Sequence, residues 1–585
     1  MTEQIDATFV ARVRAALDER VRCVVAEAAG CGWESLTHRD LAERIKALVA
    51  AACHPGDPVG LLAHATTLAA RLVVLQGPSG LFRGGDNVDS PPDSAFSIND
   101  LADALLLLRR ADGQYRGNAE LAQLLDQLLA AATPALTTGG VHTPNHRWEL
   151  SAALARLFLI SPQPALAKRV DRWLAEGIDI DDDGLYSERS ANYAAHVSNP
   201  ALLTLAEVFD RPDLVDAVDR NLTATLDLLL PDGTVETVLS RRQDQHRPKA
   251  LAAYLLPLRR VALLRDRGDL AWAAGLALAQ GIAAPAEAAT QLVLNPGIAR
   301  RLPPPAGPPR PRQRVFRSAG LLVDHRPDTT TVIFGGSDYP RHGRIRSGLA
   351  NSPTFLRLYA GTAVLSSVRL SRTFFGRGPF RGDGLTVRQD PTRPTTVTLT
   401  ERLTEAYYQP LAAPDRDARG RYELGDEGRF SAAMSFDRRT RDGVTLTTTV
   451  RARLTAAGVE LTLDLAGAVV DWALELAFRP GGTMTGVRVL GEHRWQLAAT
   501  VPAAAAYQVG PDTITVTLVE ASDGRGGPLP AAASEPVYEP GEEYRFLGGT
   551  DAATGELLYL AGQCPARVRL LLSGAGMERS GTPER

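Results

Sequence analysis

Residues 303–311 read PPPAGPPRP, a stretch of nine positions with six prolines. Proline lacks an amide hydrogen and restricts its own φ angle, so the stretch suits neither a helix interior nor a central strand. It is typical of a stiff, extended connector between domains. The hydrophobic period of the chain also changes here, which predicts a helical domain over 1–300, a linker over 301–314 and a second domain over 315–585.

Before the connector, the apolar residues repeat with helical spacing. A clear case is a set of leucines that follows the i, i+3, i+4, i+7, i+8 pattern of one buried face: Leu121, Leu124, Leu125, Leu128 and Leu129. Similar stretches recur from about residue 5 to 290, with short links marked by Gly, Pro or Asp. Such a series predicts stacked antiparallel helical hairpins in a solenoid or a ring, and the lack of a strict repeat favours the ring.

After the connector, the period becomes two. In the segment 459–465, Val and Leu alternate with Glu, Thr and Asp, as in a half-buried strand. The segment 513–518 alternates in the same way, and Thr-rich runs separated by Gly, Pro and Asp continue the pattern. This half is therefore expected to form a large antiparallel β-sandwich.

Composition narrows the functional class. The 585 residues include 64 basic and 67 acidic side chains, and the net charge of −3 argues against nucleic-acid binding. No segment is typical of a signal peptide or a membrane span. The cysteines at 23, 31, 53 and 564 form no CxxC pair, which predicts reduced thiols in a cytoplasmic protein without a membrane partner.

The segment 139–149, GGVHTPNHRWE, opens a predicted helix and carries polar groups that helix packing does not require. Asn145 is either a simple helix cap or a functional residue. The neighbouring His146 lies where the helix dipole disfavours protonation. A neutral imidazole at this place could accept or relay a proton near neutral pH.

Two further loops of the helical half carry candidate residues. The segment 181–193, DDDGLYSERSANY, starts like a calcium loop but lacks the later glutamate, so a solvated turn is expected. Tyr193 at its end is either a packed aromatic or a functional residue. In the segment 240–244, SRRQD, Arg241 and Arg242 are either solvated or able to clamp a carboxylate through two hydrogen bonds.

The second half has a basic segment at 339–348, YPRHGRIRSG, which contains His342 and Arg344. It is either a basic sheet edge or part of an electropositive wall for an anionic substrate. More arginines follow it in the sequence: Arg357, Arg369, Arg372, Arg377 and Arg381.

Together these motifs resemble the heparinase II/III-like polysaccharide lyases and the related oligo-alginate lyases, in which an incomplete α/α toroid precedes an antiparallel β-sandwich. The pair Asn145-His146 resembles the paired Asn-His of that family at a helix start. The segment DGLYSERSANY is similar to its DG-x-x-x-E-G-x-x-x-Y stretch, which places the catalytic tyrosine at Tyr193. The loop YPRHGR and the following LANSPTFLRLYAGTAVL are similar to its histidine-bearing strand, which places the catalytic histidine at His342.

The chain departs from the family pattern at two places. The family commonly shows His-x-His-x-Asp at the last motif, whereas Arg344 and Arg346 occupy the later positions here. We therefore expect no zinc site there, and no other metal or cofactor. Arg189 stands where glycine is usual after the glutamate.

The resemblance implies cleavage at C4 of a uronic acid by β-elimination. Asn145 would neutralise the uronate carboxylate, Tyr193 would act as the acid and, for removal on the same side, also as the base. His146 or His342 would be the alternative base. The other polar residues of these loops are expected to contact an acidic oligosaccharide or polysaccharide: Glu188, Arg241, Arg242 and Arg344.

Two other functions fit the sequence. Helical toroids also carry glycoside hydrolases, which need two carboxylic acids; the segment 181–183, Glu188 and Asp244 could supply them. A non-catalytic sugar-binding or scaffold protein would need none of the Asn-His-Tyr-His set. The sequence leaves the oligomeric state open.

Overall fold

The computed structural model describes residues 4–29, 32–33, 35–53, 58–84, 87–110, 118–390, 392–427, 431–533, 535, 538 and 553–575. The chain divides into two compact units. The first consists of Met1–Leu229, Gly233–Val235 and Lys249–Pro308, and the second of Leu230–Asp232, Glu236–Pro248 and Pro309–Arg585. The last change of unit falls inside the proline-rich stretch.

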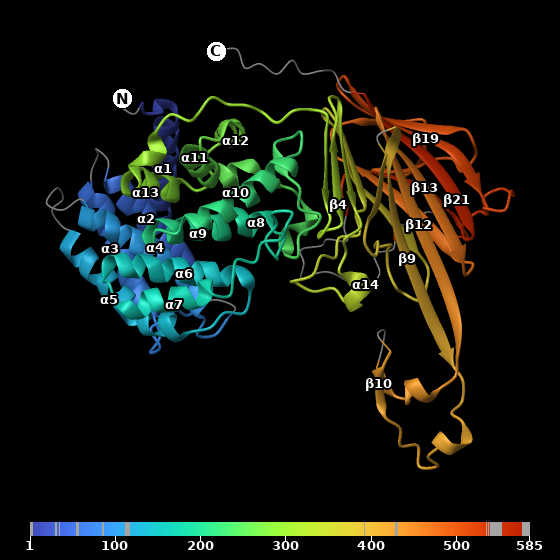
Figure 1. The fold of residues 1–585 in the computed structure, drawn as a ribbon, viewed down its shortest axis with the longest axis horizontal. Helices are drawn as coiled ribbons and strands as arrows, with labels where there is room; N and C mark the ends of the chain where they lie inside the picture. The colour runs from blue at the N-terminus through green and yellow to red at the C-terminus, as the bar shows by residue number, and fades with distance from the viewer. Residues whose placement is uncertain are drawn as a thin grey trace. The chain divides into compact units, whose positions relative to one another are not determined.

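The first unit is helical (Figure 1). Its helices, including the short ones around the candidate site, are α1 (Ala7–Ala29), α2 (His38–Ala52), α3 (Pro58–Leu75), α4 (Pro91–Arg110), α5 (Asn118–Thr138), α6 (Pro144–Ile160), α7 (Pro164–Leu174), α8 (Ala191–Tyr193), α9 (Asn199–Val208), α10 (Pro212–Asp227), α11 (Leu255–Arg265), α12 (Gly268–Gln280) and α13 (Pro285–Leu294). A small hairpin, β1 (Thr234–Val235) with β2 (Lys249–Ala250), precedes α11.

Proline marks the first position of several of these helices, among them α6, α7 and α10. The reason is that the first helical amide has no partner within the helix, so a residue without an amide hydrogen costs nothing there. The predicted leucine stripe of α5 is buried, with Leu121, Leu125 and Leu128 fully enclosed. Proline therefore explains where several helices begin, and the leucine stripe explains which face of α5 is buried, as the sequence predicts.

The helices pack against one another in sequence order and then return to the start. α2 packs against α3 and α4, α4 against α6, and α6 against α9. α13, near the end of the unit, packs against α1, α2 and α4. The first unit is therefore an α/α toroid, and the ring-like alternative predicted from the sequence is confirmed.

The second unit contains two large sheets. One has the strand order β15-β18-β19-β21-β13-β12-β9-β8 and the other β16-β17-β20-β14-β7-β6-β5-β4-β3. Neighbouring strands are antiparallel except for β17 and β20.

The strands of the first sheet are β8 (Thr386–Asp390), β9 (Arg393–Tyr408), β12 (Arg441–Thr455), β13 (Gly458–Gly467), β15 (Thr483–Thr485), β18 (Ala503–Val509), β19 (Asp512–Ser522) and β21 (Ala566–Ala575). Those of the second are β3 (Arg312–Phe316), β4 (Leu321–His325), β5 (Thr329–Phe334), β6 (Leu356–Ala360), β7 (Ala363–Arg372), β14 (Asp471–Phe478), β16 (Arg488–Gly491), β17 (Arg494–Gln496) and β20 (Glu556–Gln563). A separate hairpin, β10 (Leu424–Asp426) with β11 (Ser431–Ala433), lies in the connection between β9 and β12.

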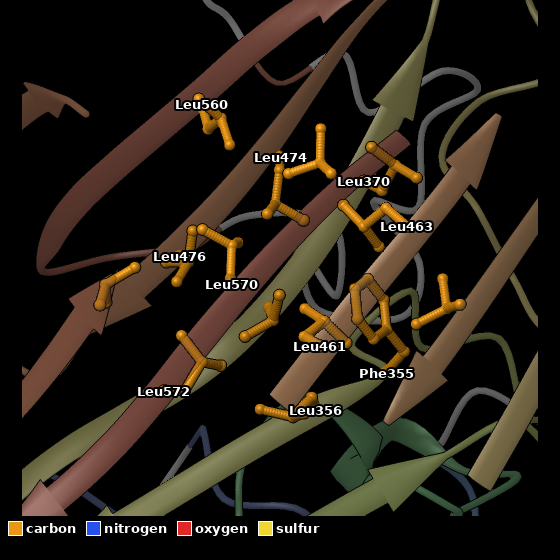
Figure 2. Close-up of a cluster of buried hydrophobic side chains, with 14 of the residues drawn as sticks. Phe355, Leu356, Leu370, Leu461, Leu463, Leu474, Leu476, Leu560, Leu570 and Leu572 are labelled. Atoms are coloured by element: carbon orange, nitrogen blue, oxygen red, sulfur yellow. The ribbon is translucent and has the colours of Figure 1, made fainter. Parts of the chain in front are cut away.

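The two sheets bury a common hydrophobic core, part of which is drawn in Figure 2. Leu461 and Leu463 of β13 and Leu570 of β21 come from one sheet, while Leu474 of β14 and Leu370 of β7 come from the other. All five are fully buried. The alternating pattern that predicted strands therefore arises because one face of each sheet packs against the opposite sheet, as a sandwich requires.

The segment Glu236–Pro248 leaves the helical unit after β1 and belongs to the second unit. A linear division at 300 does not capture this excursion. Glu236 is buried, and its Oε1 accepts hydrogen bonds of 2.8 Å from the backbone amides of Thr237 and Val238. The excursion carries Arg241 and Arg242, so these candidates lie in the second unit.

Across the described residues, no helix combines the length and apolar character that a bilayer span requires. Cys23, Cys53 and Cys564 are free thiols. Cys31 lies outside the described residues.

Candidate active site

The start of α6 places Asn145 in the second helical position. Thr143 is the N-cap, with an extended backbone and no side-chain capping bond, and Pro144 comes next. The interpretation of Asn145 as a helix cap is therefore wrong. Its side chain is 1% exposed and points away from the helix end toward another loop.

Asn145 is held by Glu188. The amide nitrogen Nδ2 donates a hydrogen bond of 2.6 Å to Oε2 of Glu188, and the two side chains are both buried. Within the described part of the chain, Oδ1 of Asn145 has no hydrogen-bond partner. An unmatched buried polar atom costs about 1–3 kcal/mol, so Oδ1 of Asn145 has the capacity to accept a hydrogen bond from a group outside the chain, such as water or a bound ligand.

A tight turn delivers Glu188 to this place. Gly184 has a φ of 85°, and a Cβ there would lie 2.6 Å from the backbone oxygen of Arg220. Oδ1 of Asp181 accepts a hydrogen bond of 2.9 Å from the amide of Leu185, so the acidic start stabilises its own turn. Arg189 has a φ of 51°, in the left-handed region that favours glycine. This left-handed backbone explains why glycine is usual at this position of the motif.

Tyr193 ends the same segment. The hydroxyl of Ser190 caps α8 by accepting a 3.2 Å hydrogen bond from the amide of Tyr193. A π-helical turn, Ala194–Ser198, follows at once. Turns of this kind are rare and occur frequently at functional sites. The Tyr193 side chain is only partly buried, so its ring is not enclosed in the core.

His146 lies beside Asn145 with its ring 7% exposed. The ring packs edge-on against His142 and Phe96, with centroid distances of 4.7 and 6.3 Å. The helical unit therefore brings Asn145, His146 and Glu188 together, with Tyr193 a few residues beyond Glu188 in the same segment.

His342 belongs to the second unit, in the connection between β5 and β6. It ends a single helical turn, α14 (Tyr339–His342), within the loop that the sequence predicts there. Asp338, which precedes the turn, and Gly343, which follows it with a φ of 57°, favour a helical turn over an extended strand. The side chains of His342 and Arg344 are both exposed.

Arg241 braces the loop that carries His342. Its Nε and Nη2 donate hydrogen bonds of 2.9 and 3.1 Å to the two carboxylate oxygens of Asp338. Its backbone oxygen accepts a 2.7 Å bond from the amide of Gly348. The fully buried Gln245 adds a second link, because its Oε1 accepts a 2.8 Å bond from the amide of Asn351. The carboxylate clamp expected of Arg241 is thus present, but it holds a carboxylate of this chain. Arg242 next to it is partly buried.

The later arginines do not form an electropositive wall. Four of them pair with carboxylates of the second unit, and three of those four are buried: Arg357 with Glu236 at 3.5 Å, Arg369 with Glu475 at 2.5 Å, Arg372 with Glu401 at 2.5 Å and Arg377, partly buried, with Glu405 at 3.1 Å. Arg381 is buried and donates a 2.8 Å bond to the backbone oxygen of Asn351. The sequence left the two alternatives open because an arginine in the sequence does not reveal a carboxylate elsewhere in the chain.

Sequence reasoning missed a polar cluster behind Asn145. Glu149, one helical turn further along α6, accepts a 2.6 Å hydrogen bond from Nδ2 of Asn99. Burial raises the pKa of Glu149 to about 7. Arg156 bonds to Oδ1 of Asn99 at 3.1 Å and to Asp103 at 2.7 Å. The available signal was a carboxylate placed four residues after Asn145, on the same helical face.

The cluster lines a pocket of about 720 Å³ within the helical unit. His196, from the π-helical turn after Tyr193, also lines it. His196 is exposed, yet desolvation and the charge of Lys249 lower its pKa to about 4. His196 is therefore neutral at physiological pH. In the residues that the structure describes, no group of His, Cys, Asp and Glu side chains has the geometry of a metal site.

Comparison with known proteins places the fold. No protein-family model matches the sequence, and no curated protein matches it. Among solved structures, a heparinase III matches with a TM-score of 0.51 and 9% identity over 93% of this chain and 79% of that one. A Paenibacillus xanthan lyase matches with a TM-score of 0.53 and 10% identity over 97% of this chain, which spans 56% of the lyase. A heparan sulfate lyase from Pedobacter heparinus has a TM-score of 0.49 and 10% identity, over 92% of this chain and 76% of that one.

These similarities define the class of the fold, an α/α toroid followed by an antiparallel β-sandwich. It is the fold of heparinase-like polysaccharide lyases. The fold expected from the resemblance is therefore confirmed.

Proposed function

We propose that the chain is a glycan lyase that cleaves a uronate-containing oligosaccharide or polysaccharide by β-elimination. The observation that carries the proposal is the buried Asn145–Glu188 pair, in which one amide hydrogen is engaged and the carbonyl oxygen has no hydrogen-bond partner among the described residues. An amide fixed in this way still offers one N–H donor and one oxygen acceptor to a carboxyl group.

The reaction needs such a group because the C5 proton of a uronate is scarcely acidic while the adjacent carboxylate is charged. A donor that neutralises this carboxylate stabilises the enolate-like charge that develops when the proton leaves. Electrons of the C5–H bond then form the C4–C5 double bond, the C4–O4 bond breaks, and O4 takes up a proton. Asn145 serves as the neutralising donor, and Glu188 fixes its orientation.

Proton transfer falls to Tyr193 and a histidine. The phenol of Tyr193 protonates the departing O4, and it also removes the C5 proton when both lie on one side of the ring. His146 or His342 is the base for the opposite stereochemistry. Of the residues expected to contact substrate, Arg344 is exposed, whereas Arg241 is engaged with Asp338 and acts through the His342 loop.

A hydrolase is the competing function, and two of its candidate carboxylates have other partners. Oδ1 of Asp181 caps its own turn, and Oδ1 of Asp244 accepts a 2.5 Å hydrogen bond from the hydroxyl of Ser240. Neither residue lines the pocket of the helical unit.

The test is a panel of uronate oligosaccharides incubated with the full chain, followed by the ultraviolet absorbance of the unsaturated product. We expect absorbance to rise with chain cleavage for at least one substrate, and the Asn145→Ala variant to lose it. Cleavage without absorbance would establish hydrolysis instead. Binding without any cleavage would favour a sugar-binding protein and overturn the proposal.

A further inference from the structure

Asp179, in the link between α7 and α8, binds the start of α6. Its Oδ1 accepts hydrogen bonds of 3.0 Å from Nη2 of Arg147 and from Nε1 of Trp148. Trp148 is fully buried, and the Arg147 guanidinium lies over its ring, 4.7 Å from the centroid. Both donors belong to the first turns of the helix, which also carry Asn145. Asp179 therefore holds the helical side of the Asn145–Glu188 pair.

The same carboxylate binds the turn that carries Glu188. Its Oδ2 accepts a hydrogen bond from the hydroxyl of Ser187, and the backbone oxygen of Asp179 accepts one of 2.9 Å from the Ser187 amide. A β-bridge between Ile180 and Tyr186 continues this pairing toward the tip of the turn. Ser187 immediately precedes Glu188 in the sequence. Asp179 therefore holds the other side of the pair as well.

Arg147 is occupied by this clamp. Its Nη1 donates a 3.0 Å hydrogen bond to Oε2 of Glu176, while its Nη2 bonds to Asp179. The Arg147 side chain is 13% exposed and that of Asp179 is 16% exposed, so both charges are largely withdrawn from solvent. Charge-assisted hydrogen bonds in such surroundings are strong and directional. The clamp is therefore a stiff link between α6 and the turn.

We propose that Asp179 is a positioning residue of the lyase site, which keeps Asn145 and Glu188 in register by clamping the two segments that carry them. The inference rests on the proposed lyase function. Asn145 and Glu188 lie 43 positions apart and are joined by one side-chain bond of 2.6 Å. Such a bond weakens steeply when its ends separate or tilt. Loss of the clamp therefore misorients the Asn145 amide without removing a group that touches the substrate.

Two substitutions of Asp179 separate its hydrogen bonds from its negative charge. Asp179→Ala removes every side-chain bond of the clamp, and we expect kcat to fall by about 10²-fold while KM changes by less than about threefold. Asp179→Asn keeps Oδ1 for Arg147 and Trp148, and its Nδ2 donates to the hydroxyl oxygen of Ser187. It should therefore keep kcat within about threefold of the wild type.

Coupling to Asn145 distinguishes positioning from general stability. In the Asn145→Ala background, Asp179→Ala should cause no further loss of kcat/KM, because the amide that it positions is already absent. Asp6→Ala is the matched control, since Asp6 also uses both carboxylate oxygens to join two segments, accepting bonds from the Phe9 amide and from Arg259. It should lower the free energy of unfolding in urea and leave kcat unchanged.

Amide hydrogen exchange across 180–190, followed by mass spectrometry, tests the clamp without catalysis. We expect Asp179→Ala to accelerate this exchange by about tenfold or more, and Asp179→Asn and Asp6→Ala to leave it unchanged. Ser187→Ala removes only the side-chain bond on the turn side. It should accelerate the same exchange and lower kcat by about tenfold, and it takes the place of Asp179→Ala if that variant does not fold.

The outcomes separate this inference from the proposed function. Unchanged kcat or unchanged exchange in Asp179→Ala, or in Ser187→Ala where it takes its place, would overturn the inference and leave the lyase function standing. So would a kcat of Asp179→Asn as low as that of Asp179→Ala, or a full additional loss in the Asn145→Ala background. A wild type that forms no unsaturated product from any uronate substrate would overturn the lyase function, while accelerated exchange in Asp179→Ala would leave the clamp standing.

Discussion

Replacing Glu188 with alanine separates the structural and the catalytic roles of the Asn145–Glu188 pair. The bond joins a buried amide to a buried carboxylate at 2.6 Å, a charge-assisted geometry that contributes about 1.5–3 kcal/mol. Removing the carboxylate leaves the amide N–H buried without this partner, but it also relieves the burial of a charge. We therefore expect the free energy of unfolding to fall by about 2 kcal/mol, as measured by urea denaturation.

The effect on turnover should be larger than the effect on stability. An amide that is no longer oriented loses its donor function, and removal of one such donor commonly lowers kcat by about 10²–10³. The assay is the initial rate of unsaturated product formation on the best substrate of the uronate panel. KM should change less than kcat, because the pair acts on charge that develops during the reaction.

A double-variant cycle provides the decisive comparison. If Glu188 acts through Asn145, Glu188→Ala combined with Asn145→Ala should be no slower than Asn145→Ala alone. Asp126→Ala, which removes an exposed ion pair with Arg109, is the control and should cost at most about 1 kcal/mol with unchanged kcat. The reasoning would be refuted if the losses of transition-state stabilisation in the two single variants added up in the double variant. It would also be refuted by an unchanged kcat in Glu188→Ala.

Further expected outcomes concern the acid, the loop brace, a buried carboxyl and a strained turn. Tyr193→Phe should abolish turnover with little change in substrate affinity or unfolding, because only the phenolic hydroxyl is lost. A rate within about tenfold of the wild type would exclude its role. Arg241→Ala should accelerate amide hydrogen exchange across 337–351 by about tenfold or more and lower kcat, since Asp338 loses its brace; unchanged exchange would contradict this. The free energy of unfolding of the wild type should fall as the pH rises from 4.5 to about 7, because the Glu149 carboxyl ionises in the unfolded chain while it stays protonated in the folded one. Glu149→Gln has no such carboxyl, so its stability relative to the wild type should increase over the same range. Free energies of unfolding from urea denaturation that differ by the same amount between the two proteins at every pH in this range would disprove this prediction. Gly184→Ala should lower the free energy of unfolding by at least about 2 kcal/mol, because its φ of 85° and a backbone oxygen 2.6 Å from the new Cβ leave no room; an unchanged denaturation midpoint would argue against it.

Much of the architecture could be predicted because it depends on neighbours in sequence. The alternation through Leu461 and Leu463 indicates a strand with one buried face, and both leucines are fully buried in the sandwich. The leucine stripe that begins at Leu121 indicates a helix in the same way. Proline at the start of a helix acts through its own missing amide hydrogen. Periodicity and backbone restriction are local properties, so the sequence by itself determined the order and type of the elements.

The partners of the polar residues were decided only by the tertiary structure. Asn145 and Glu188 lie 43 positions apart, and Arg241 and Asp338 lie 97 apart. Nothing local distinguishes Arg369, buried against Glu475, from an exposed arginine. The reason is that burying a charge is unfavourable unless a partner meets it, and packing between distant segments supplies that partner. The sequence determined which groups the site could use, and the fold decided which of them are held in place.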